Sequence, residues 1–347
     1  MNYFETKSGQ QAYLEQLQIA LKETHYGKEY FNACLNYAKR LLDNRLPVIF
    51  DPVHLSRLLG LNEQLFPFVF SDQSAFYRTL SIPKKSGGER ELAIPSARLK
   101  QIQRWILDTI LNYIPVSPHA TGFSPGCSIV KNATAHLGNE CIISIDIKDF
   151  FPSIHMEDVF RIFYYYGYTK ELSFAFARLC CFCNSLPQGS PASPAISNIR
   201  CLKLDKRISA LCQKQGAVYT RYADDITISG SKCVRDIMPT VYSIIEQEGF
   251  IRNERKDHTA FPHQRQSVTG LTVNSGQVRV PKKYKRQLKQ EIYYCQKYGP
   301  WNHQKYIGDS HAFFREHLYG KALFVLMVEP DLGRTLLDEL DKINWDT

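Results

Sequence analysis

The stretch RYADDITISG, residues 221–230, places two carboxylates side by side between short runs of alternating apolar residues. The alternation predicts two strands joined by a turn, with Ala223 and Asp224 near its tip. Adjacent like charges repel each other, and folding does not remove that repulsion. Asp224 and Asp225 therefore have two open explanations: a polar turn, for which Asp is well suited, or a site for cations.

A third carboxylate, Asp146, ends another predicted strand. The run CIISIDIKDFFPSI, residues 141–154, is apolar and β-branched, which is typical of a buried strand, and Pro152 stops it. An Asp in such a place is costly unless it is paired or bound to metal. Oxygen ligands suit hard divalent cations, and two such ions can activate an attacking hydroxyl and stabilise a leaving phosphate. The three carboxylates together predict a metal site for phosphoryl transfer.

The composition is that of a folded protein with a positive excess. The chain has 347 residues, of which 44% are apolar and 22% charged, and its net charge is +9. This length allows two or three domains or subdomains, and the charge favours polyanionic partners such as nucleic acid. The ten cysteines show no zinc-ligand spacing and are typical of a reducing compartment. Because no signal-peptide core or run of about 20 apolar residues is present, we expect a soluble cytoplasmic protein without membrane contact.

Periodicity predicts how the chain is organised. Residues 1–75 carry apolar residues at helical spacing, and we expect a helical N-terminal extension. Residues 76–95 predict a β-hairpin with a basic tip, followed by a long helix over residues 97–114. Residues 267–281 predict a further hairpin that turns at Asn274-Ser275-Gly276, and the tail from Lys282 predicts helices with a basic start.

Five motifs, in order, resemble those of the reverse transcriptases over about residues 76–285. They are GGERELAIP (87–95), DIKDFF (146–151), LPQGSPASP (186–194), YADD (222–225) and GFIRNERK (249–256). Chance agreement of five ordered motifs is well below ~1%. Two further stretches, NATAH (132–136) and VTG (268–270), resemble the hallmarks of bacterial retron reverse transcriptases.

The resemblance implies an α+β fold of the right-hand polymerase type. Fingers and palm would span residues 76–275, and a helical thumb would span residues 276–347, after the N-terminal extension at 1–75. Asp146, Asp224 and Asp225 would be the catalytic, metal-binding triad, with the backbone carbonyl of Ile147 completing one coordination shell. The expected cofactor is a pair of Mg²⁺ ions, with Mn²⁺ as an alternative.

The resemblance also implies which residues bind the nucleotide. Arg90, with Lys84 or Lys85, would hold the triphosphate, because arginine suits bidentate phosphate contact. Phe151 would exclude a ribose 2′-OH, Gln188 would line the pocket, and Lys256 would protonate the leaving pyrophosphate or stabilise its charge. The plain structural alternatives are a core Phe, a solvated hairpin and a surface salt bridge.

A second implied group would bind RNA. Its members lie in NATAH, in VTG and at the basic start of the C-terminal helices: Asn132, His136, Val268, Thr269, Gly270, Lys282, Lys283, Lys285 and Arg286. The basic run would follow RNA phosphates. A structural histidine, a residue that only shapes the hairpin and a solvated helix face are the alternatives.

The implied function is that of a retron enzyme. Such an enzyme copies part of a structured non-coding RNA into single-stranded DNA, primes from a guanosine 2′-OH and leaves a branched RNA–DNA product (msDNA) from dNTPs. Many such enzymes act in anti-phage defence with a separate effector protein. The alternatives are a group II intron or diversity-generating reverse transcriptase, an RNA-dependent RNA polymerase, and a non-catalytic RNA-binding scaffold on a polymerase fold.

Overall fold

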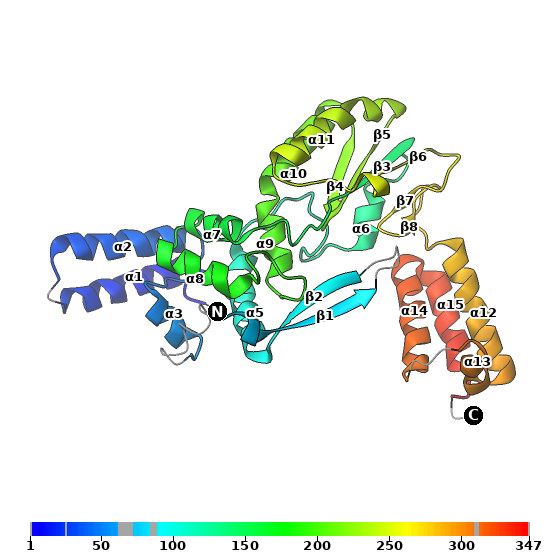
Figure 1. Ribbon diagram of the computed structural model, residues 1–347, viewed down its shortest axis with the longest axis horizontal. Coiled ribbons are helices and arrows are strands. Elements are labelled where there is room, and N and C mark those ends of the chain that lie inside the picture. Colours follow the sequence, from blue (N-terminus) through cyan, green and yellow to red (C-terminus); the bar gives the residue numbers. More distant parts are fainter. Residues whose placement is uncertain (1, 25, 62–71, 84–88, 309–311, 346–347) are drawn as a thin grey trace. The chain divides into compact units, whose positions relative to one another are not determined.

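The structure, a computed structural model, describes residues 2–24, 26–61, 72–83, 89–308 and 312–345 (Figure 1). The chain forms two compact units. The first comprises Met1–Ser124, Ile147–Lys206 and Ile245–Ile251, and the second comprises Pro125–Asp146, Arg207–Ile244 and Arg252–Thr347. Both contain helices and antiparallel strands, so the predicted α+β class is confirmed.

The first unit is mostly helical and carries one β-hairpin. Its described elements are α1 (Lys7–Lys22), α2 (Lys28–Asp43), α3 (Pro52–Leu58), η2 (Ser74–Phe76), β1 (Tyr77–Pro83), β2 (Glu89–Pro95), α5 (Ala97–Thr109), η3 (Leu111–Tyr113), α7 (Met156–Tyr165), α8 (Lys170–Cys180) and α9 (Ser193–Arg200). α3 begins where Asp51 accepts a hydrogen bond from the backbone N–H of His54 at 2.7 Å, with Pro52 in the first helical position.

Hydrogen bonds hold the predicted N-terminal helices to the rest of this unit. Arg40 of α2 donates to the carbonyl of Gly167 at 2.8 Å, and the Tyr168 hydroxyl donates to the carbonyl of Pro47 at 3.2 Å. The predicted hairpin is present as β1 paired with β2, with Tyr77 opposite Pro95. A Cβ added at Gly189 would lie 2.3 Å from the carbonyl oxygen of Ala93, so the 186–194 loop packs directly on the backbone of β2.

The second unit is built on an antiparallel sheet. Its described elements are α6 (Ile129–Thr134), β3 (Cys141–Asp146), β4 (Val218–Tyr222), β5 (Asp225–Gly230), η4 (Lys232–Ile237), η5 (Glu254–Lys256), β6 (His258–Ala260), β7 (Ser267–Val268), β8 (Leu271–Thr272), α12 (Lys282–Tyr298), α13 (Pro300–Tyr306), α14 (Phe314–Val328) and α15 (Pro330–Asp341). Two more helices, α10 (Leu202–Lys214) and α11 (Met238–Gln247), cross the division between the units. Among the described residues the strand order of the main sheet is β4-β5-β3-β6.

Paired isoleucines occupy the centre of this sheet. Ile143 pairs with Ile228 and Ile145 pairs with Ile226 across β3 and β5, and all four side chains are buried. A continuous run of β-branched residues fits a strand that is covered on both faces. The buried 141–146 strand was predicted, and it ends at Asp146 as expected.

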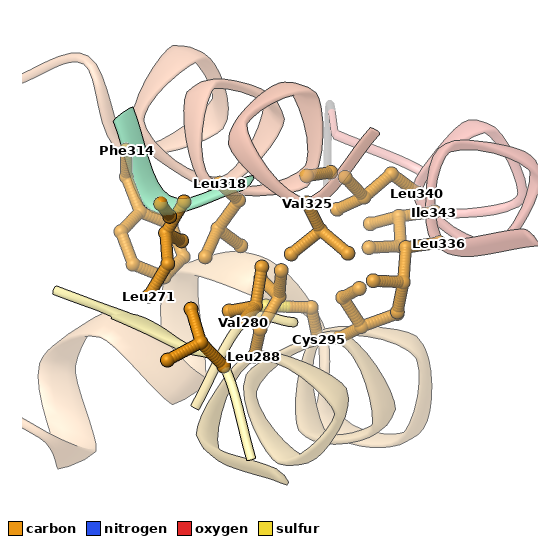
Figure 2. Close-up of a cluster of buried hydrophobic side chains, with 14 of the residues drawn as sticks. Leu271, Val280, Leu288, Cys295, Phe314, Leu318, Val325, Leu336, Leu340 and Ile343 are labelled. Carbon is orange, nitrogen blue, oxygen red and sulfur yellow. The ribbon is translucent and has the colours of Figure 1, made fainter. Parts of the chain in front are cut away.

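The C-terminal helices share a hydrophobic core with the sheet side of the unit (Figure 2). Leu288 of α12, Leu318 and Val325 of α14, and Leu336 of α15 meet in it. A Cβ added at Gly333 would lie 2.2 Å from the Cα of Leu326, so α14 and α15 cross at their closest approach on a glycine. Along the residues that the structure describes, no helix combines the length and apolar character needed to cross a bilayer.

The segment after the sheet contains two turns rather than one. The predicted turn at residues 274–276 is confirmed, since Thr272 bridges to Arg279 around it and Gly276 has φ 69°. A tighter hairpin precedes it, in which β7 pairs with β8 and only Thr269 and Gly270 connect them. Both residues have positive φ, 45° and 82°, as a two-residue hairpin turn of the primed type requires.

Candidate active site

The three predicted carboxylates come together at one end of the sheet. Asp146, the last residue of β3, lies directly opposite Asp225, the first residue of β5. Asp224 precedes Asp225 in the turn between β4 and β5. Like charges directly opposite each other across two strands are destabilising, so this end of the sheet concentrates negative charge at a cost.

The three carboxylates differ in how far they are exposed to solvent. Asp146 is buried, with 8% of its surface exposed, whereas Asp224 is half-buried and Asp225 is exposed at the strand end. Partial desolvation of the Asp225 carboxyl group, together with the charges of Asp224 and Asp146, raises its pKa to about 6, and Lys256 opposes that shift. The site thus holds one carboxylate that is reluctant to ionise and would ionise readily beside a cation.

Two residues of the GFIRNERK motif bind Asp146. The Nζ of Lys256 lies 2.9 Å from Oδ2, and the Nδ2 of Asn253 donates to Oδ1 at 3.2 Å. The backbone N–H of Asn253 also donates to the carbonyl of Asp146 at 2.7 Å. The hydrogen bond to Asp146 raises the pKa of Lys256, so the ammonium stays charged. Sequence reasoning selected Lys256 and missed Asn253, which stands three residues before it.

The turn that presents the Asp pair is held by a buried arginine that sequence reasoning also missed. Ala223 has φ 58°, a left-handed conformation that costs a non-glycine residue roughly 1 kcal/mol. Arg221 is fully buried, and its Nη1 donates to the carbonyl of Ala223 at 3.1 Å. A charged residue in a strand pattern is normally expected at the surface, and nothing in the sequence marks this one as buried.

The donor set suits hard divalent cations. Three carboxylates converge, and desolvation together with the charges of the other two raises the pKa of Asp225. Among the described residues, no group of three or more His, Cys, Asp or Glu side chains already has the arrangement of a metal site. Both carboxylate oxygens of Asp146 are bonded to protein groups, one to Lys256 and the other to Asn253.

The predicted nucleotide-binding residues lie in the first unit, except Lys256. Phe151 is half-buried, with its ring 6.2 Å from that of Phe123, whereas the neighbouring Phe150 is buried in the core. Gln188 is half-buried beside Gly189, and Ile147 is buried. Arg90 belongs to β2, and Lys84 lies outside the described residues, as does Lys85.

The NATAH and VTG residues lie inside the second unit. Asn132, His136 and Val268 are all buried, and Asn132 donates to the hydroxyl of Thr269 at 3.4 Å. The ring of His136 lies between two hydroxyls, those of Ser229 and Thr220, each at 2.7 Å. In this structure these side chains contact protein groups, which corresponds to the plain structural alternative for His136.

The four basic residues at the start of α12 differ in how exposed they are. Lys282, Lys283 and Arg286 are exposed and free to meet solvent anions. Lys285 is not, because its Nζ lies 2.8 Å from a carboxylate oxygen of Glu329 and its side chain is 17% exposed. Three of the four predicted cations therefore lie on an accessible face, and the fourth is part of the internal packing.

Comparisons with known proteins identify the family. The family described as "Reverse transcriptase (RNA-dependent DNA polymerase)" matches residues 82–275, over half of the chain. The retron Ec86 reverse transcriptase of Escherichia coli is 33% identical over 88% of this chain and 92% of its own length. The retron Mx162 reverse transcriptase of Myxococcus xanthus is 33% identical over 93% of this chain and 76% of its own length. The retron Mx65 reverse transcriptase of the same organism is 32% identical over 75% of this chain and 63% of its own length.

Proposed function

Since this chain belongs to the reverse transcriptases of bacterial retrons and is an RNA-directed DNA polymerase with the right-hand polymerase fold, we propose that it makes msDNA. It would copy part of a structured non-coding RNA into single-stranded DNA, primed from a guanosine 2′-OH. The observation that carries the catalytic part is the placement of Asp146 opposite Asp225, with Asp224 beside it. The retron part is supported by the relatives and by the NATAH and VTG stretches.

Reverse transcriptases use divalent metal ions, and we propose two Mg²⁺ ions here, with Mn²⁺ as a substitute. Asp146, Asp224 and Asp225 would hold them, with the carbonyl of Ile147. When bound, such ions activate the attacking hydroxyl and stabilise charge on the leaving phosphate. They would also remove the repulsion that now falls on Asp225.

The protein's own groups would position the nucleotide. Arg90 and Lys84 would hold the triphosphate, Phe151 would reject a ribose 2′-OH, and Gln188 would line the pocket. Lys256 is charged and 52% exposed at its side chain, so it can leave Asp146 and neutralise the departing pyrophosphate. Proton transfer from Lys256 to that group is the alternative role.

The RNA would lie along the exposed cations of α12. Lys282, Lys283 and Arg286 share the accessible side of the helix start, where phosphate contacts give salt-dependent affinity. Replacing these three residues by Gln should weaken RNA binding and flatten its salt dependence. The matched change of Lys285 should instead destabilise the helices, because it breaks the pair with Glu329.

We place the protein in the cytoplasm, in anti-phage defence with a separate effector protein. The motifs and relatives argue against a group II intron or diversity-generating enzyme. An RNA-dependent RNA polymerase would incorporate NTPs, so a dNTP-versus-NTP incorporation assay decides that alternative.

The central test expresses the chain with the adjacent non-coding RNA and looks for covalently joined RNA and DNA. Asp224→Asn with Asp225→Asn should abolish the DNA while RNA remains bound. Asp338→Asn, at an exposed position of α15, is the matched control and should leave the product unchanged. RNA binding without detectable DNA in the unmodified protein would favour the scaffold alternative.

A further inference from the structure

The two stretches typical of retron enzymes contact each other. Nδ2 of Asn132, in NATAH, donates to Oγ1 of Thr269, in VTG, at 3.4 Å, although 137 residues separate them. The Thr269 hydroxyl in turn donates to the carbonyl of Ile129 at 3.3 Å. One hydroxyl therefore joins the β7–β8 turn to both ends of the first helical turn of α6.

Thr269 is an unusual residue for this turn. A two-residue hairpin turn with positive φ favours Asn or Gly, and a β-branched residue at φ 45° is strained. The following position is a glycine, which takes φ 82° without a steric cost. The threonine supplies what Gly lacks, a hydroxyl that bonds α6, so its contacts offset the strain.

His136 makes the corresponding connection to the catalytic hairpin. Its Nδ1 and Nε2 bond Ser229 of β5 and Thr220 of β4, the two strands that carry the Asp pair. Burial lowers the pKa of His136 to about 4, so the ring is neutral near pH 7 and bonds one hydroxyl as donor and the other as acceptor. No charge is available there to attract a phosphate.

Apolar side chains also connect α6, the VTG hairpin and α12. Ala133 of α6, Val268 and Leu271 of the VTG hairpin, and Leu288 of α12 belong to one buried cluster. Leu271 and Leu288 are labelled in Figure 2. α6 thus contacts the hairpin that leads to α12 through Asn132 and Ala133, and His136, in the turn that follows α6, contacts the catalytic strands.

We propose that Asn132, His136 and Thr269 are positioning residues, through which α6 and the turn after it fix the VTG hairpin and the start of α12 at a set distance from the catalytic hairpin. They would act on the primer–template through that placement and would not contact RNA bases or phosphates. The proposal deepens the polymerase function above and rests on it for its kinetic readout.

A double-mutant cycle on a short synthetic primer–template tests the proposal. Asn132→Ala and Thr269→Val should each raise the KM for primer–template about tenfold, the effect of losing the partly buried hydrogen bond between them, while the KM for dNTP stays within about twofold. The double variant should be no worse than either single variant. Thr269→Ser keeps the hydroxyl and should restore the KM, and Lys131→Gln, exposed on the same helix, should change nothing.

The proposal would be overturned if the increases in the KM for primer–template multiplied in the double variant, because that would show two independent contacts with nucleic acid. Failure of Thr269→Ser to restore the KM would also overturn it. A general loss of folding would raise both KM values and lower the melting temperature, and would not be reversed by the conservative variant.

Hydrogen exchange on the RNA-free protein gives a readout that does not depend on activity. Asn132→Ala should speed exchange of the backbone amides of Thr272 and Val273, which are hydrogen-bonded beside the hairpin, and leave those of β3 unchanged. Unchanged exchange at the hairpin overturns the proposal even if the enzyme is active. Faster exchange in a protein that never makes DNA supports the network and contradicts the proposed function alone.

Discussion

The catalytic hairpin and the VTG hairpin use two-residue turns of similar length for opposite purposes. Each connects two strands through a two-residue turn in which a non-glycine residue, Ala223 or Thr269, takes a left-handed conformation. In the first, three carboxylates gather with incomplete charge compensation. In the second, the turn hydroxyl bonds α6 and the flanking side chains are buried. The difference teaches that a strained turn can either present polar groups to a ligand or join two parts of the core.

The largest expected effect comes from removing charge at the catalytic hairpin. Asp146→Asn or Asp225→Asn should lower kcat by on the order of a thousandfold, because each removes an anionic ligand from the expected cation site. Single-turnover extension of a primer–template measures this loss. The equivalent loss of a polar group at the other hairpin, in Thr269→Val, should leave kcat nearly unchanged. Equal losses of kcat at the two hairpins would contradict the different roles assigned to them.

The next effect tests what holds the catalytic turn. Arg221→Met removes a buried donor to the Ala223 carbonyl and should lower the free energy of unfolding by about 3 kcal/mol. Urea denaturation measures it, with Arg161→Met at an exposed position as the control. Arg221→Lys should recover little, since an ammonium cannot reproduce the guanidinium geometry. A stability loss no larger than that of the control would mean that the turn is held by other contacts.

A matched pair of glycine substitutions compares the two turns directly. Ala223→Gly relieves the strained φ but adds unfolded-state entropy, so stability should change by less than about 0.5 kcal/mol. Thr269→Gly gains the same relief yet loses the hydroxyl contacts, and should cost about 1–2 kcal/mol. Thermal melts of both variants measure the difference. Equal costs would show that the Thr269 hydroxyl contributes little.

A further effect is the pH dependence of the metal-free protein. The pKa of Asp225 rises from 3.8 to about 6 on folding, so the stability from this group is fully present below about pH 4 and is lost as pH rises through 6. Because the residue is exposed and screened by solvent, the loss by pH 7.5 should be only about 1 kcal/mol. The free energy of unfolding is measured for the unmodified protein and for Asp225→Asn, both in chelator, across pH 4.5–7.5. The difference between the two proteins isolates the contribution of Asp225. A difference in stability between the two proteins that stays constant with pH would contradict the raised pKa of Asp225 as the cause.

Sequence patterns predicted the catalytic end of the sheet better than its supports. The strand ends at Asp146 and Asp225 follow from β-branched runs and turn chemistry, which are local signals. The register that places these two residues opposite each other is a long-range pairing, and their separation along the chain does not encode it. The five ordered motifs supplied the family and therefore the fold.

Several supporting features were missed because they arise from tertiary contacts. Arg221 is a charged residue that a one-dimensional pattern assigns to the surface, and it is fully buried. The turn at Thr269-Gly270 was overlooked because Asn274-Ser275-Gly276 has more typical turn residues. Asn253 contributes through a backbone approach to Asp146 that only the folded chain creates.

Glu329 has a consequence for how fast RNA could bind. Its carboxylate accepts from the backbone N–H of Val280 and from Lys285, and it stands between α14 and α15. One acidic side chain therefore fixes the start of α12 to the remaining helices before any ligand arrives. An RNA that binds Lys282, Lys283 and Arg286 would meet a preorganised surface, so its association rate should be set by electrostatic attraction and fall with salt, with no slow folding phase.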